Sequence, residues 1–374
     1  MAEDTQQPQR LSDRRIPVLD ELRGIAVLLV MFCHTRLFGV GSPESGVTEI
    51  LYARLANASS VGVDLFFVLS GYLITTILLQ SRGDKHYYRV FYARRAARIF
   101  PLYYLALIIF FFIAPYVLQL TGHAEWLKDP LMQAPAELLW TYTLNWRHIL
   151  PVIPCSLLIQ NFWTLAVEEQ FYLVWPAIIK HSDRRKLIWL CLAIIAASPL
   201  PRLFYSSSGM AEASWQLTYC RLDALAAGAL VALCFTDAEY RARLEKFALP
   251  LVALSLWGLI AFTQNASWLW FSLTAVFFGS CLVLVLGNEN ASIVKPRVSM
   301  ALRFFGKYSY AMYVFHQPLS ILLAKAGFNA HVLTEMWGSR FCAIVAVNFV
   351  NLAVVTLLAW LSWHLLEKQF MKLR

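Results

Sequence analysis

The sequence predicts an all-α polytopic membrane protein with about ten transmembrane helices and both termini in the cytoplasm. Apolar residues make up 59% of the 374 residues and charged residues 15%, and the mean hydropathy is +0.56. Soluble domains average about 45–50% apolar and about 25% charged residues. The apolar residues also gather in runs near the roughly 20 residues that a helix needs to cross a bilayer.

Ten such runs follow one another along the chain, and we interpret each as one span. They lie near residues 18–38, 61–80, 99–120, 161–180, 187–205, 215–235, 247–264, 268–287, 308–327 and 341–363.

The charges predict the direction in which the chain crosses. With the N-terminus in the cytoplasm, every second loop is basic, and those loops carry more than three times as many Lys and Arg residues as the opposite loops. The positive-inside rule therefore predicts that both termini are cytoplasmic. This distribution also explains the net charge of +9, so we expect membrane lipid as a partner and no nucleic acid.

Residues 1–15 are polar and contain Pro8, and we expect a flexible cytoplasmic tail there. Residues 16–374 form one predicted transmembrane domain. We expect no cleavable signal peptide, because the first apolar run contains Arg23 and no small-residue cleavage site follows it. The seven cysteines have no metal-like or disulfide-like spacing, so we expect no metal and no disulfide framework.

The first span contains two ionisable residues, Arg23 and His34. Eleven residues of helix turn through about 1100°, so both side chains project from one face, roughly 16 Å apart along the axis. Ionisable groups inside a bilayer are functional candidates because their desolvation is costly. The alternative is that Arg23 reaches the cytoplasmic headgroups and His34 makes a structural hydrogen bond.

An arginine cluster follows the second span, in YYRVFYARRAARIFPLYY. Arg94, Arg95 and Arg98 lie at the predicted cytoplasmic mouth of the third span. Arg95 and Arg98 share a helical face because they are three residues apart. Guanidinium groups bind phosphate oxygens in bidentate fashion, which suits a phosphorylated cytosolic ligand. Positive-inside signalling or lipid headgroup binding is the alternative.

Residues 121–160 form the longest stretch outside the spans. The stretch is rich in proline around an aromatic patch at 138–146, which is too short to cross a bilayer. We expect an outer lid or re-entrant segment that shapes an acceptor site. Three tryptophans in it have the alternative role of interfacial anchors. They are Trp126, Trp140 and Trp146.

Three acidic residues lie in the predicted outer halves of spans, at the depth of His34. Asp64 is in GVDLFFVLSGYLI, and Glu168 and Glu169 are in NFWTLAVEEQFYLVWP. A carboxylate beside His34 could orient the imidazole ring and stabilise its protonated form. The sequence does not identify which carboxylate does so.

Two later spans carry further candidates for acceptor binding. Arg221 and Asp223 begin RLDALAAGALVA, and the alternative is that they only neutralise charges inside the bundle. Tyr313 and His316 share a helical face in GKYSYAMYVFHQPLS. His316 is a second proton-active candidate, although we favour a structural Tyr–His hydrogen bond.

Together these segments resemble the acyltransferase-3 family of integral membrane O-acyltransferases. The resemblance covers six motifs in order, from VLDELRGIAVLLVMFCHT to YSYAMYVFHQPL. The family's arginine, ten intervening residues and histidine fall on Arg23 and His34, and its RxxR pair falls on Arg95 and Arg98. The resemblance implies that the histidine is catalytic and that the arginines help to bind the acyl-coenzyme A donor.

The family's conserved glutamate falls on Glu168, with Glu169 a close competitor. Family members often have LDGLRG where this chain has Glu21, which we expect at the cytoplasmic interface. Many members carry an added C-terminal hydrolase-like domain. This sequence ends soon after its last span, so we expect a stand-alone member.

The resemblance implies acyl transfer, with acetyl the usual group, from cytosolic acyl-CoA to a hydroxyl of a carbohydrate or glycosylated acceptor in the bacterial inner membrane. We expect Arg94, Arg95 and Arg98 to hold the donor phosphates. His34 would act as general base or as a transient acyl carrier, and Arg23 would stabilise the oxyanion. The rival is a multi-pass transporter or flippase for a glycan or lipid-linked sugar, which the absence of visible repeats disfavours.

Overall fold

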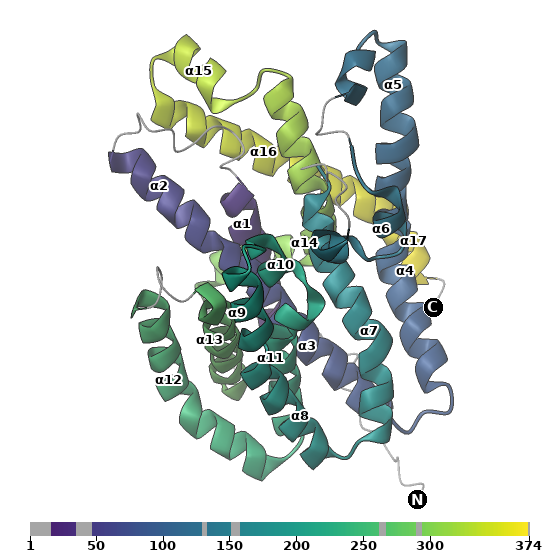
Figure 1. The fold of residues 1–374 in the computed structure, drawn as a ribbon, viewed down its shortest axis with the longest axis vertical. Coiled ribbons are helices and arrows are strands. Elements are labelled where there is room, and N and C mark those ends of the chain that lie inside the picture. Colours follow the sequence, from purple (N-terminus) through teal and green to yellow (C-terminus); the bar gives the residue numbers. More distant parts are fainter. Residues whose placement is uncertain are drawn as a thin grey trace, which may run out of the picture.

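The computed structural model describes residues 16–34, 47–128, 133–150, 158–261, 267–288 and 294–372. All regular structure in these ranges is helical, which confirms the predicted all-α class. In Figure 1 the helices form an elongated bundle, with α5 and α15 toward one end of the long axis and α8 and α12 toward the other. The predicted tail, residues 1–15, lies outside the described residues.

The helices are joined mostly by short connections. Their bounds are α1 Pro17–His34, α2 Val47–Ala58, α3 Gly62–Ser81, α4 Tyr87–Ile108, α5 Ala114–Leu120, α6 Ala136–Trp140, α7 Trp163–His181, α8 Arg184–Ala197, α9 Pro199–Ser207, α10 Ala211–Gln216, α11 Leu222–Cys234, α12 Ala238–Ala261, α13 Ser267–Gly287, α14 Pro296–Lys325, α15 Ala330–Trp337, α16 Arg340–Ser362 and α17 Lys368–Lys372.

Six helical segments within the described ranges are long and apolar enough to cross a membrane, and each overlaps a predicted span. The other four predicted spans correspond to α1, α7, α11 and α14. The apolar helix α11 is short, and the remaining three are rich in ionisable and polar residues. The count of ten crossings and the cytoplasmic placement of the termini stay predictions. The six segments are Glu49–Ser81, Tyr87–Leu120, Arg184–Ser207, Ala238–Ala261, Trp268–Gly287 and Arg340–Lys372.

Loops that the charge pattern assigns to one side of the membrane meet at one end of the bundle. The Arg82 guanidinium after α3 donates to the backbone oxygen of Ser182 between α7 and α8, at 2.7 Å. At the other end, Arg340, the first residue of α16, lies 3.3 Å from the Glu49 carboxylate in α2. These contacts agree with the predicted alternation of loops.

The pairing of α1 with α14 brings two backbones into direct contact. A Cβ atom on Gly24 of α1 would collide with the carbonyl oxygen of Leu302 in α14, and one on Gly306 of α14 would collide with the carbonyl oxygen of Asp20. Small residues permit this close approach, as they do in many membrane helix pairs. The two helices therefore have one closely defined spacing.

Glu21 takes part in the same pairing. Its side chain is only 1% exposed, accepts a hydrogen bond from the Ser299 hydroxyl and lies 3.3 Å from the Arg303 guanidinium of α14. The expectation that Glu21 faces the cytoplasmic interface was wrong, because the helix turns this residue toward α14, where a cation compensates its charge.

The helices α3 and α11 form a second close pair. A Cβ atom on Gly71 of α3 would collide with the carbonyl oxygen of Leu225, and one on Gly228 of α11 would collide with that of Val68. This contact places Asp64 and Arg221, near the N-terminal ends of the two helices, side by side.

We expect Gly228→Ala to destabilise the fold by about 1–3 kcal/mol, the usual cost of overpacking a close contact. The measurement is the midpoint of thermal unfolding of purified protein in detergent. Gly279→Ala in α13 is the matched control, because its added Cβ would meet only the Ala227 Cβ at an ordinary 3.4 Å. Equal midpoints for the two variants would contradict the close packing of α3 on α11.

Candidate functional site

A cavity of about 110 Å³ lies between α1, α3, α4, α7 and α14, and we call it the arginine cavity. Arg23, Arg95 and Arg98 all line it. Arg23 lies 3.2 Å from Asp20, whereas Arg95 and Arg98 make no ion pair with any described residue. The buried Nε of Arg95 also has no hydrogen-bond partner among the described residues. The cavity therefore contains positively charged hydrogen-bond donors, some of which have no partner among the described residues.

The structure separates Arg94 from the other two arginines of its cluster. Arg94 is exposed and lines a different groove of about 470 Å³, together with His86, Arg89 and Phe370. Adjacent residues differ by about 100° around a helix, so α4 directs them to different surfaces. The expectation that Arg94 acts with Arg95 and Arg98 was therefore wrong.

Glu168 lies in the arginine cavity, where two hydroxyl groups hold it. It accepts hydrogen bonds from Ser70 at 2.7 Å and from Tyr172 at 3.0 Å. Glu169 lines the same cavity. Neither glutamate contacts His34, so the expectation of a glutamate that orients His34 is not met, and Glu169 lies on the side of the arginines.

A second cavity, of about 420 Å³, contains His34, and we call it the histidine cavity. Its walls combine aromatic rings, amide side chains and one guanidinium group. The Oδ1 atom of Asn161 is buried there without a hydrogen-bond partner in the described part of the chain. Its polar and aromatic lining includes Gln160, Asn161, Trp163, Trp215, Arg221, Phe271, Tyr313 and Gln317.

Tyr313 and Val63 line both cavities, so the two cavities share a wall. The Tyr313 hydroxyl donates to the Asn161 carbonyl oxygen at 2.9 Å and lies 2.6 Å from the Thr164 hydroxyl. These contacts fix the ring that separates the cavities. The predicted hydrogen bond between Tyr313 and His316 forms through the Tyr313 backbone carbonyl oxygen, because the Tyr313 hydroxyl is directed to Asn161 and Thr164 instead.

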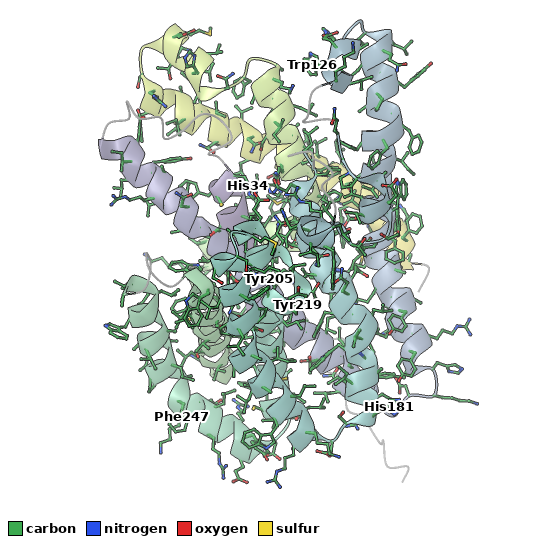
Figure 2. The ribbon with its side chains drawn as sticks, viewed as in Figure 1. His34, Trp126, His181, Tyr205, Tyr219 and Phe247 are labelled. Carbon is green, nitrogen blue, oxygen red and sulfur yellow. The ribbon has the colours of Figure 1, made fainter. Side chains whose placement is uncertain are left out.

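His34 is the last residue of α1, and Figure 2 labels it beside the end of that helix. Its Nδ1 lies 2.8 Å from the Val30 carbonyl oxygen. Its ring packs edge-on against His316 of α14, with ring centres 4.8 Å apart and planes at 72°. The neighbours of the His34 ring are thus a carbonyl group and a second imidazole, and none of the expected carboxylates.

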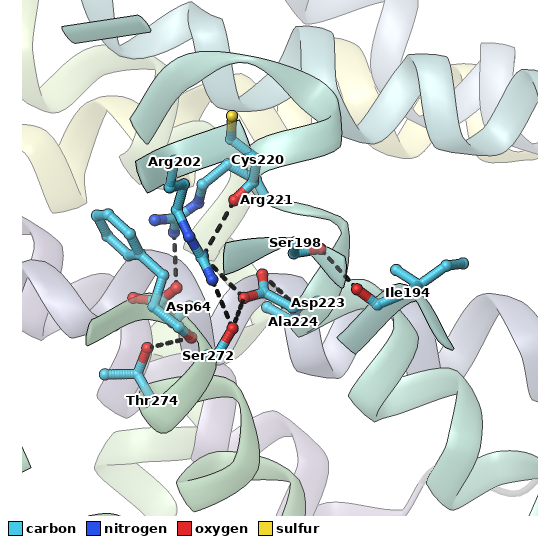
Figure 3. Close-up of polar contacts among 11 residues, drawn as sticks. Asp64, Ile194, Ser198, Arg202, Cys220, Arg221, Asp223, Ala224, Ser272 and Thr274 are labelled. Atoms are coloured by element: carbon cyan, nitrogen blue, oxygen red, sulfur yellow. Dashed lines mark hydrogen bonds and ion pairs between the residues drawn. The ribbon is translucent and has the colours of Figure 1, made fainter. Parts of the chain in front are cut away.

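Figure 3 shows two buried ion pairs between helices, one of which includes Arg221 from the lining of the histidine cavity. Arg221 lies 2.6 Å from Asp64, and Arg202 lies 2.8 Å from Asp223, whose carboxylate also accepts from Ser272 at 2.7 Å. Arg202, Asp223 and Asp64 are at most 1% exposed and line neither cavity. Asp64, one of the three carboxylates considered for His34, is paired with Arg221 instead. For Arg221 and Asp223 the ion pairs support the alternative, that these residues neutralise charges inside the bundle.

Two neighbouring side chains fix the position of the Arg221 guanidinium group. Its guanidinium stacks on the Phe271 ring at 3.8 Å from the ring centre, while Asp64 holds one terminal nitrogen. A cation over an aromatic face is electrostatically favourable, most of all away from water. Its Nε is buried without a partner in the described chain, and the side chain reaches the histidine cavity.

Residues 139–148 of the segment 121–160 make contacts with the bundle. The Tyr103 hydroxyl donates to the Leu139 carbonyl oxygen at 2.7 Å, and the Trp146 indole donates to Gln170 at 3.1 Å. Burial, together with a neighbouring arginine, lowers the pKa of His148 in this segment. Its described end, Gln160, lines the histidine cavity.

Sequence reasoning missed several residues of the two cavities. Ser70 and Tyr172 stand inside motifs that the sequence singles out, and their polar groups in apolar spans were an available signal. The charge pattern assigns Arg202 to a loop on the outer side of the membrane, yet its side chain is fully buried. Trp215 and Phe271 carry no signal, because aromatic residues are common throughout this chain.

Comparison with known proteins identifies relatives along nearly the whole chain. A family model described as an acyltransferase domain matches residues 16–361. The putative peptidoglycan O-acetyltransferase of Bacillus subtilis is 29% identical, with 95% of this chain and 55% of that protein aligned. The peptidoglycan O-acetyltransferase of Listeria monocytogenes is 25% identical, with 84% and 50% aligned. A putative O-acetyltransferase of Staphylococcus aureus is 26% identical, with 96% and 58% aligned.

The chain spans about half the length of these curated relatives. No solved structure matches it.

We expect Arg221→Ala to cost about 3–5 kcal/mol, because it leaves the buried Asp64 carboxylate without its counter-ion. The measurement is again thermal unfolding in detergent. Arg243→Ala is the matched control, since Arg243 pairs with Glu239 at the surface, where an ion pair contributes about 1 kcal/mol or less. A destabilisation by Arg221→Ala no larger than that of the control would refute a structural role for the pair.

Proposed function

The chain belongs to the acyltransferase-3 family, and on that premise we propose that it transfers an acetyl group from acetyl-CoA to a carbohydrate hydroxyl at His34. The observation that carries the proposal is the pair of cavities that share Tyr313 as a wall, with three arginines in one and His34 in the other. A donor and an acceptor that enter separate cavities would meet at that wall. Family membership favours this reaction over transport.

The arginine cavity suits the donor. Acyl-CoA carries phosphate groups, and guanidinium forks bind phosphate oxygens strongly. Arg95 and Arg98 have no carboxylate partner among the described residues, so their donors are available to a ligand. A cavity of about 110 Å³ is too small for a whole CoA molecule and fits one end of it. We propose that Arg95 and Arg98 bind the phosphate groups of the donor. The pantetheine arm would then pass beside Arg23.

The histidine cavity suits a sugar acceptor. Ligand sites typically have about 300–1,000 Å³, a mostly apolar lining and a few polar groups that fix orientation. Trp163 and Trp215 offer faces for the apolar side of a sugar ring, and the free Oδ1 of Asn161 offers an acceptor for a hydroxyl hydrogen. Two of the relatives are named for peptidoglycan, and we extend that acceptor class to this chain as part of the proposal.

His34 has the form that a general base requires. A carbonyl oxygen can only accept, so Nδ1 must carry the hydrogen in its contact with Val30, and the lone pair of the neutral ring is on Nε2. Nε2 would take the proton of the acceptor hydroxyl while its oxygen attacks the thioester carbonyl. The carbon–sulfur bond then breaks, and the departing thiolate takes the proton, which leaves an ester and free CoA.

A second route gives the same products in two steps. Nε2 of His34 first takes the acyl group from the thioester and releases CoA, and the acceptor hydroxyl then takes the acyl group from His34. In both routes the oxyanion would form at the wall between the cavities, where the Tyr313 hydroxyl could donate to it by turning away from the Asn161 carbonyl oxygen. Arg23 lines only the arginine cavity and would act on the donor, far from the carbonyl that reacts beside His34. Labelling of His34 by radioactive acetyl-CoA without acceptor is expected only for the second route.

We expect His34→Gln to lower kcat by about 10²–10⁴-fold, the usual contribution of a general base. The measurement is the release of CoA from acetyl-CoA by purified protein with soluble peptidoglycan fragments as acceptor. His331→Gln is the matched control, because the His331 side chain is 80% exposed and lies outside both cavities. Full turnover of His34→Gln would refute the assignment of the base.

We expect the double change Arg95→Ala and Arg98→Ala to weaken acetyl-CoA binding by about tenfold or more for each charge-assisted hydrogen bond to phosphate that it removes. As the control, Arg94→Ala removes one positive charge from the same helix, on the surface that faces the other groove, and should leave the affinity for acetyl-CoA unchanged. Calorimetric titration of acetyl-CoA measures both. Equal weakening by the two changes would indicate a general effect of surface charge and would contradict the donor site.

A further inference from the structure

His316 is the buried ionisable residue next to His34 that the proposed reaction does not use. Its side chain in α14 is 1% exposed, and its ring centre lies 4.8 Å from that of His34. It lines neither the arginine cavity nor the histidine cavity, so it does not meet a ligand directly. Any effect on the reaction would therefore pass through His34.

The hydrogen bonds of the pair define where its free lone pairs are. His316 Nδ1 lies 2.6 Å from the Tyr313 carbonyl oxygen, and that oxygen also accepts from the Asn161 amide at 2.8 Å. Because a carbonyl cannot donate, Nδ1 of His316 carries the hydrogen and Nε2 carries the lone pair. The same argument gives His34 a lone pair on Nε2. The two neutral rings thus have the same tautomer.

The Nε2 atom of His316 is buried and has no hydrogen-bond partner among the described residues. A buried acceptor without a donor costs about 1–3 kcal/mol, so folding alone does not favour it. A phenylalanine would fill a similar space without that cost. The unused acceptor, beside a base that gains a proton in each cycle, indicates a role in the reaction.

Within the part of the chain that the structure describes, no carboxylate contacts His34, although a carboxylate commonly supports a histidine base. Asp64 is paired with Arg221, and Glu168 is held by Ser70 and Tyr172 in the other cavity. When His34 takes a proton at Nε2, both of its nitrogens become donors, and among the described residues only Nδ1 has a hydrogen-bond partner. The second donor needs an acceptor until the thiolate departs.

We propose that His316 is a positioning residue for His34 and that its Nε2 accepts a hydrogen bond from the protonated ring. This inference rests on the proposed function. Ring centres 4.8 Å apart allow facing ring nitrogens to reach hydrogen-bond distance after a rotation of the rings, with the helices in place. His316 keeps its own hydrogen on Nδ1 throughout, so the proton passes from the acceptor hydroxyl to His34 and then to the thiolate.

Two amide variants separate this role from a role in packing. In His316→Asn the amide nitrogen lies near the position of Nδ1 and can still donate to the Tyr313 carbonyl, but nothing replaces the lone pair of Nε2. In His316→Gln the amide oxygen lies near the position of Nε2 and can accept, but no group donates to Tyr313. The proposal therefore predicts opposite consequences for two changes of similar size.

We expect His316→Gln to keep kcat within about tenfold of the unchanged protein and His316→Asn to lower it by about 10²-fold or more, the lower end of general-base effects. KM for acetyl-CoA should stay the same in both, because His316 lines neither cavity. The assay is the release of CoA from acetyl-CoA with soluble peptidoglycan fragments, on variants whose elution and unfolding midpoint match those of the unchanged protein.

A reversed order, with the Asn variant active and the Gln variant inactive, would assign His316 to packing and overturn the proposal. Equal activities, high or low, would overturn it too. If the Asn variant does not fold, His316→Phe replaces it as the variant without an acceptor, and if the Gln variant does not fold, His316→Glu replaces it as the variant with one. An unchanged protein that releases no CoA would count against the proposed function instead.

Discussion

The contact between α1 and α14 is the constraint on which the candidate site depends. Gly24 and Gly306 let the two backbones touch, and the buried Glu21 pairs with Arg303 across the same interface. Because this contact sets the spacing near one end of the pair, it also sets how closely the rings of His34 and His316 approach near the other. The arrangement of the two histidines is thus a consequence of backbone packing, and side-chain rotation adds only a local adjustment.

The arginines inside the bundle include two groups with different physical roles. Arg202 and Arg221 each have a carboxylate partner, so their charges are neutralised inside the protein. Arg95 and Arg98 have no ion pair with a described residue, although they lie inside the bundle beside a cavity. Burial of a cation without a counter-ion is costly, and an anionic ligand would offset that cost. The paired arginines therefore belong to the scaffold, and the unpaired ones are where a phosphorylated donor is expected.

The sequence predicted the course of the helices better than the contacts between them. Apolar runs located the helices because a bilayer-length apolar segment has few other uses, and the spacing of Arg23 and His34 correctly placed both on α1. The partner of His34 could not be predicted from the sequence, because the rotation of α14 about its axis decides whether His316 faces α1 or the outside of the bundle. Arg94 was misassigned for a related reason, since adjacent residues on one helix face different surfaces.

The sequence by itself determined the all-helical class, the positions of the apolar helices and the family, because these depend on local composition and on ordered motifs along the chain. Only the tertiary structure decided which charges neutralise each other and which remain for a ligand. It paired Asp64 with Arg221, placed Glu168 away from His34, and put His316 against it. The physical reason is that pairing in a bundle follows the crossing and rotation of helices, which residues far apart in the chain determine together.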